Sequence, residues 1–229
     1  MLPGRPVKVS CSGMPADEIN PEPRWPAVLA ILAVAGLYLA LPEQLTVGPS
    51  WVLVVLVLAL LAASVISRHL HMIRLNQLAG HLLLGLLTFA MLGSLWLLVA
   101  ALPAHKESPK ELLISATALW GTNVLVFASW YWRLDAGGPN QRDLRGSHTD
   151  GAFLFPQMTM DEDLKIAAGE DNWRPGFVDY LFLAFNTSTA FSPTDVPVLS
   201  RWAKLMMMTQ SSISLTTLAI LAARAVNIL

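Results

Sequence analysis

Five apolar runs follow one another along the chain, separated by polar or proline-containing stretches. Each run is close to the roughly 20 residues that an α-helix needs to cross the hydrocarbon core of a bilayer. Proline and tryptophan stand at their ends, where helices stop and where amphipathic rings meet the lipid–water interface. The pattern therefore predicts an all-α integral membrane protein with five transmembrane helices, over residues 25–41, 51–67, 82–102, 112–132 and 205–223.

A long stretch between the fourth and fifth runs divides into two parts of different character. Residues 134–175 carry eight acidic and four basic side chains, a net charge of −4, so we expect an aqueous acidic loop. Residues 177–191 are apolar except at Asp179 and over 186–189, which makes them too short to span and too apolar for a solvated linker. They predict a re-entrant helix, which enters the membrane and leaves on the same side.

A hydroxyl-rich segment follows this short helix and reads Thr-Ser-Thr-Ala-Phe-Ser-Pro-Thr-Asp over residues 187–195. Non-helical backbone at membrane depth is tolerated only where it is buried in protein or lines a water-filled cavity. Carbonyl and hydroxyl oxygens that face such a cavity replace the water around an ion. The segment therefore predicts a filter-like pore loop. The competing interpretation is an ordinary turn in which Asp195 caps the following helix.

These nine residues resemble the T-x-T-T-V-G-Y-G-D signature of potassium channels and match it at Thr187, Thr189 and Asp195 with equal spacing. The order of elements over 111–229 is similar to the pore module of tetrameric cation channels: helix four, the loop 134–175, a re-entrant helix and loop over 177–195, and a last helix over 201–229. The resemblance implies a homo-oligomer, with a tetramer favoured, because one pore loop cannot enclose a path alone. It also implies an ion path formed by Thr187, Thr189, Ala190, Phe191, Ser192, Thr194 and Asp195.

Two glycines of that signature are replaced by Ser192 and Thr194, with Pro193 between them. Glycine lets successive carbonyls point at one axis through positive φ angles, whereas proline has a fixed φ and no N–H. We therefore expect a weakly selective path for monovalent cations, with Asp195 attracting ions to its mouth. The chain is also similar over most of its length to uncharacterised bacterial membrane proteins with an F-N-x-S-T-A-F-S-P-T-D run, which adds no function.

Two further regions lie before this module: a polar N-terminal segment over 1–24 and a three-helix membrane region over 25–110. Basic side chains gather after the second apolar run, at Arg68, His69, His71, Arg74 and His81. No cysteine or carboxylate accompanies them, so a basic interface facing lipid phosphates is favoured over a metal site. Asn123 in the fourth run is either a functional group or, as we favour, a cross-link between helices.

Composition changes the range of possible functions. Of the residues 54% are hydrophobic and 14% are charged, and the formal net charge of −1 provides no excess of bases for nucleic acid. The single cysteine, Cys11, cannot form an intramolecular disulfide. We expect a multi-pass protein of the cell membrane that contacts lipids and monovalent cations and uses no cofactor or metal. The alternatives are a non-conducting scaffold and an intramembrane enzyme using acids such as Asp179 and Asp195.

Overall fold

The computed structural model of the protein describes residues 21–101, 109–145, 148, 151–170, 173–189 and 196–226. Within these ranges every regular element is a helix, and the β-type pairing is a single bridge between Phe153 and Val198. The all-α prediction is therefore confirmed. Cys11 and most of the predicted filter lie outside the described residues; those filter residues are Ala190, Phe191, Ser192, Thr194 and Asp195.

Four helices are long and apolar enough to cross a membrane: α2 (Ser50–His69), α3 (Ile73–Ala101), α4 (Pro109–Leu134) and α8 (Arg201–Val226). They coincide with four of the five predicted spans. The first, α1 (Trp25–Leu39), is apolar but has only 15 residues. At 1.5 Å per residue it is about 22 Å long, against about 30 Å of hydrocarbon. A count of five spans therefore stays a prediction.

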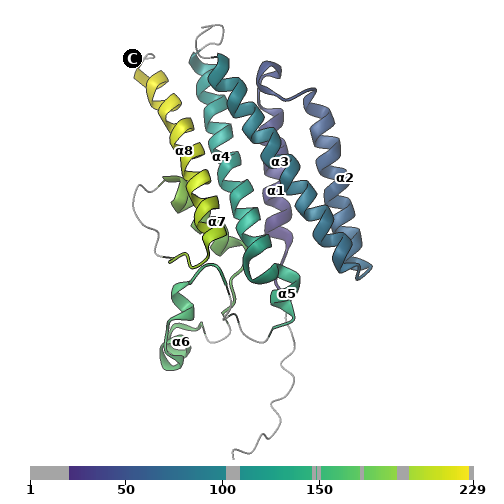
Figure 1. Ribbon diagram of the computed structural model, residues 1–229, viewed down its shortest axis with the longest axis vertical. Coiled ribbons are helices and arrows are strands. Elements are labelled where there is room, and N and C mark those ends of the chain that lie inside the picture. Colours follow the sequence, from purple (N-terminus) through teal and green to yellow (C-terminus); the bar gives the residue numbers. More distant parts are fainter. Residues whose placement is uncertain are drawn as a thin grey trace, which may run out of the picture.

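The long helices stand side by side along the longest axis of the molecule, with α2 at one edge (Figure 1). α4 lies in the middle, where it contacts α1, α3, α7 and α8. On the outside, large apolar side chains are exposed on α2, α3 and α8, among them Trp51, Phe89, Trp96, Leu205 and Met208. Such a surface suits lipid, because apolar groups at this density would be costly to expose to water.

Short helices collect at one end of the bundle, below the start of α1 and α8 (Figure 1). They are η3 (Asp135–Gly137), α5 (Pro139–Asp143), η4 (Pro156–Met158) and α6 (Glu162–Ala168). We call this the polar end. α6 is exposed, as expected for an aqueous loop, but Ala152, Phe153 and Phe155 are buried.

The acidic loop is therefore not uniformly aqueous. The Leu154 N–H donates to the Pro197 carbonyl at 2.9 Å, and the Leu199 N–H donates to the Ala152 carbonyl at 2.8 Å. These bonds hold residues 152–154 against the entry to α8, where the Phe153 ring meets those of Tyr131, Tyr180 and Trp202. The net charge of the whole loop predicted an aqueous segment and did not indicate this apolar stretch.

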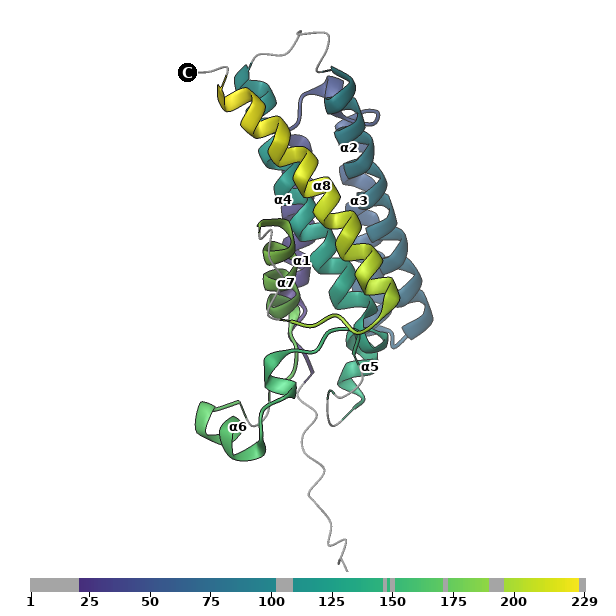
Figure 2. The same cartoon turned by 60° about the vertical axis from the view of Figure 1, so that its left-hand side comes forward.

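A 13-residue helix, α7 (Phe177–Thr189), runs antiparallel to α4 and reaches only part of the way along it (Figure 2). Ring contacts mark its depth: Phe177 meets Trp132 near the polar end of α4, and Phe185 meets Trp120, both with centroids 5.9 Å apart. Trp120 and Trp132 are about 18 Å apart along α4. The bonds of residues 197 and 199 then show that the chain has come back to the polar end.

Candidate functional site

Two of the predicted filter residues lie in the last turn of α7, and the structure places them on opposite sides of that helix. Thr187 is buried, and its hydroxyl donates to the Leu183 carbonyl at 2.8 Å. Thr189 is exposed, and its hydroxyl donates to the Phe185 carbonyl at 2.9 Å. Both hydroxyls thus bond back to their own helix, a common arrangement for threonine within helices. Thr189 faces outward, whereas Thr187 contributes to packing against α8.

The C-terminal end of α7 is held by polar side chains of α8. Gln210 is completely buried and its amide nitrogen donates both to the Ala184 carbonyl at 2.7 Å and to the Ser188 hydroxyl at 2.8 Å. The Ser214 hydroxyl donates to the Ser188 carbonyl at 3.0 Å, and the Ser211 hydroxyl to the Thr187 carbonyl at 3.3 Å. Carbonyls at a helix end need such partners, because leaving them unbonded in an apolar interior is costly.

α4 completes this cluster from the other side. The Tyr131 hydroxyl donates to the Gln210 side-chain oxygen at 2.5 Å, and the Asn123 amide donates to the Gln210 main-chain carbonyl at 3.1 Å. Asn123 is therefore a cross-link between helices, as the sequence favoured. We refer to Asn123, Tyr131, Ser188, Gln210 and Ser214 as the inner polar cluster. It ties together the three helices of the predicted pore module at about mid-length.

A second cluster lies at the polar end around Asp135, whose side chain is fully buried. One carboxylate oxygen accepts from the Ala152 N–H at 2.5 Å, and the other accepts from the Tyr180 hydroxyl at 2.6 Å. His148 Nε2 lies 3.5 Å from the same carboxylate. Asp135 therefore connects the end of α4, the first turns of α7 and the segment that pairs with residues 197–199.

Arg142 on α5 is the central cation of this cluster. Its guanidinium donates to the main-chain carbonyls of Trp132 at 2.8 Å and Asp135 at 2.9 Å, and forms an ion pair with Glu22 at 2.9 Å. It also stands 5.2 Å from the centre of the Tyr180 ring. Glu22 in turn accepts from the indole N–H of Trp132. A residue ahead of the first helix is thus fastened to the end of the fourth.

A neighbouring ion pair joins Arg24 to Asp143 at 2.6 Å, and Arg24 also donates to the Asn140 side-chain oxygen at 2.5 Å. Burial lowers the pKa of Arg24, and the bond to Asp143 opposes this effect. The Asn140 amide nitrogen donates to the Asn76 side-chain oxygen at 3.1 Å. The Asn76 amide nitrogen in turn donates to the Ser64 carbonyl at 2.6 Å. This chain of bonds extends the cluster from α5 to α3 and α2.

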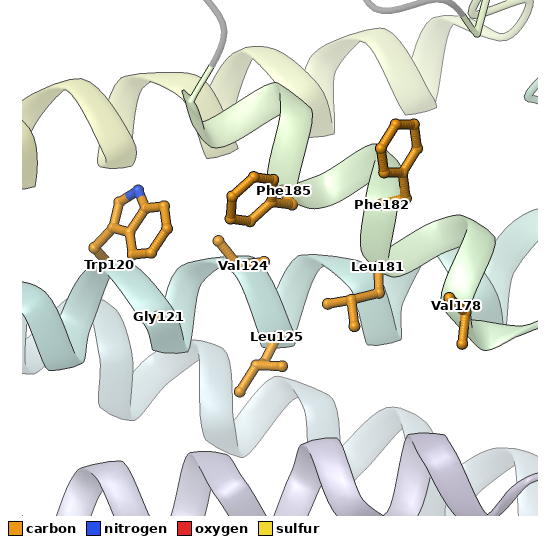
Figure 3. Close-up of a pocket in the computed structure, with 8 residues that line it drawn as sticks. All are labelled: Trp120, Gly121, Val124, Leu125, Val178, Leu181, Phe182 and Phe185. Atoms are coloured by element: carbon orange, nitrogen blue, oxygen red, sulfur yellow. The ribbon is translucent and has the colours of Figure 1, made fainter.

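An apolar groove of about 510 Å³ lies between α4 and α7 (Figure 3). No lining side chain carries a charge or a hydroxyl group, and the lining is Trp120, Gly121, Val124, Leu125, Val178, Leu181, Phe182 and Phe185. The groove offers no group for acid–base or nucleophilic chemistry. Asp179, an acid named for the enzyme alternative, accepts the Gly176 N–H at 2.7 Å and so caps the start of α7.

Sequence reasoning missed most of both clusters. Gln210 lies in a run of hydroxyl residues and was not predicted to be functional. An amide inside an apolar helix is nevertheless the same signal that singles out Asn123. Tyr131 stands between two tryptophans at the end of the fourth apolar run, a pattern that favours an interfacial ring, yet its side chain is fully buried. Asp135 and Arg142 entered only as charges of an aqueous loop. Their low exposure could not be read from composition.

Among the described residues, no group of three or more histidine, cysteine, aspartate or glutamate side chains is placed to hold a metal ion. Comparisons with protein-family models, with curated proteins and with solved structures give no match to this chain.

Proposed function

We propose that the protein is a subunit of a homo-oligomeric channel that conducts monovalent cations through a path formed by the end of α7 and the segment after it. The observation that carries the proposal is the course of residues 177–199. A short helix leaves the polar end and stops about 18 Å along α4, and the chain is back at the polar end by residue 197. This is the backbone course that a re-entrant pore loop requires.

Electrostatics at the end of α7 favour cations. The C-terminal end of a helix carries a partial negative charge, which attracts positive ions. The inner polar cluster fixes this end inside the bundle. Ser192, Thr194 and Asp195 follow it in the sequence, and their oxygen-bearing side chains support an ion path that does not depend on glycine.

Assembly follows from the same proposal, because a single loop has no partner across an axis. α8 presents Thr209, Ser212 and Thr216 on its exposed side, and each hydroxyl bonds back to its own helix. Small residues of this kind permit close approach of helices in a membrane. We propose that this face of α8 lines or borders the axis of a tetramer in the cell membrane, with α1 as a fifth span around which the bilayer thins.

The re-entrant course predicts which side of the membrane each segment occupies. In a Cys11→Ser background, Leu164→Cys and Leu199→Cys, both at exposed positions on either side of α7, should react with an impermeant thiol reagent from the same side of sealed vesicles. Lys110→Cys, at the start of α4, is the matched position for the opposite side. If the reagent labelled Leu199→Cys from the same side as Lys110→Cys, residues 177–199 would cross the membrane. The proposal of a pore loop would then be wrong.

If the protein conducts cations, liposomes that contain its purified oligomeric fraction should show cation flux. This flux should discriminate only weakly between potassium and sodium. Asp195→Asn should lower the flux most at low ionic strength, since the Debye length is about 30 Å at 0.01 M. Thr189→Ala should change the ratio of permeabilities. Asp161→Asn, an exposed acid near α6, and Thr117→Ala, whose hydroxyl bonds back to Leu113 as that of Thr189 does to Phe185, are the matched controls.

A non-conducting scaffold is the second candidate, and one observation favours it. The Ser188 hydroxyl and the Thr187 main-chain carbonyl both accept hydrogen bonds from α8, as a structural turn would require. On this proposal the liposomes carry no potassium, sodium or chloride flux, and Asp195→Asn and Thr189→Ala have no phenotype. Turnover of lipid in the same vesicles would instead favour an enzyme.

A further inference from the structure

Arg133 is a cation at the polar end of α4 with unused hydrogen-bonding capacity. Its guanidinium donates one long hydrogen bond, from Nη1 to the Asn76 carbonyl at 3.4 Å. In the described part of the chain the ion pairs of Arg24 and Arg142 occupy Asp143 and Glu22, and no carboxylate lies within ion-pair distance of Arg133. The residue is partly exposed, and one long bond leaves most of its five N–H donors available to a ligand.

The guanidinium lies in a crevice that a glycine creates on α3. A Cβ atom at Gly80 would stand 1.9 Å from Cζ of Arg133 and about as close to both terminal nitrogens. The close approach of Arg133 to the backbone of α3 therefore requires glycine at this position. The crevice holds the planar fork of donors in one place, which is the geometry that binds a phosphate oxygen pair well.

The α2–α3 side of this crevice carries bases and no acid. No acidic residue occurs between Glu43 and Glu107, so the α2–α3 hairpin carries the exposed bases Arg68 and Arg74 without any acid of its own. Arg24 lies near enough to both Arg68 and Arg133 for their charges to repel. An anion that bound between these helices would relieve this repulsion.

The surface next to the crevice is that of a lipid interface. Trp130, one turn before the end of α4, donates from its indole to the Thr88 hydroxyl at 2.9 Å, and its ring centre is 6.0 Å from that of His81. The outer face of α3, opposite the face that carries Gly80, exposes the apolar side chains of Leu78, Leu82 and Phe89. A cation beside tryptophan, in a bundle with an apolar outer surface, matches a phospholipid rather than a free anion.

We propose that Arg133, seated in the Gly80 crevice between α3 and α4, binds the phosphate of an anionic membrane phospholipid. Arg68 and Arg74 strengthen the attraction to anionic over zwitterionic headgroups. The inference requires only that the helices lie in a membrane. It holds for the channel and for the scaffold alike, so a failed flux assay does not affect it.

The test uses the full chain in mild detergent and measures binding of phosphatidylglycerol by native mass spectrometry, with phosphatidylcholine and inorganic phosphate as comparison ligands. Wild type should prefer phosphatidylglycerol, and Arg133→Gln should bind it about fivefold more weakly, the effect of one interfacial arginine. Arg145→Gln, an exposed arginine at the same end, is the matched control and should bind as wild type does.

Two further variants separate loss of the site from loss of the fold. Arg133→Lys keeps the charge and should retain part of the affinity, whereas Gly80→Ala should weaken binding because its methyl group displaces the guanidinium. Equal affinity of wild type and Arg133→Gln for phosphatidylglycerol would overturn the proposal. So would equal binding of phosphatidylcholine, or inorganic phosphate competing at the concentration of the lipid, which would indicate a site for a soluble anion.

Discussion

Arg142→Met should lower the free energy of unfolding by about 3–5 kcal/mol, because it removes one partner of a buried ion pair and leaves the Glu22 carboxylate without its cation. The guanidinium is 5% exposed and the carboxylate 12%, so solvent screens the pair little. The same change deprives the Trp132 and Asp135 carbonyls of their donor. Methionine keeps an unbranched stem in place of the arginine methylenes, which limits the contribution of an empty cavity.

Equilibrium unfolding in mild detergent measures this effect, with Arg145→Met as the control. Arg145 is three residues further on and exposed, so its replacement should change stability by no more than about 0.5 kcal/mol. Glu22→Gln and the double variant complete a double-mutant cycle. The double variant should lose much less free energy of unfolding than the sum of the two single losses. Additive losses would show that Glu22 and Arg142 do not stabilise one another.

Gln210→Leu should lower stability by about 1–3 kcal/mol, since it leaves polar groups without partners in the middle of the bundle. The Tyr131 hydroxyl loses its acceptor, and the Ser188 hydroxyl and Ala184 carbonyl lose a donor. Leucine fills a similar volume, so the change tests the hydrogen bonds rather than the packing.

The matched control for Gln210→Leu is Ser212→Ala on the same helix. Ser212 is exposed and its hydroxyl bonds only to the Met208 carbonyl of its own helix, so we expect almost no change in the unfolding midpoint. The same detergent titration serves for both variants. Equal stability of the two would mean that the inner polar cluster contributes nothing to holding the end of α7.

The sequence by itself determined the parts of this protein that depend on local apolar length. A run of about 20 apolar residues can satisfy its backbone bonds only as a helix in a lipid environment. For this reason α2, α3, α4 and α8 were predicted close to where they lie. A lone amide in such a run has few alternatives to bonding with another helix, which is why the role of Asn123 was predicted as well.

Only the tertiary structure decided which polar residues meet. Asp135 and Tyr180 are 45 positions apart in the chain, and Glu22 and Arg142 are 120 apart. No local pattern encodes these pairings. They arise because residues 152–154 pair with residues 197–199, just before α8. This pairing brings the start of α7 next to the polar end of α4. The depth at which α7 stops is likewise set by Gln210 and Ser214 on α8, since a short apolar helix has no preferred depth until its terminal carbonyls find partners.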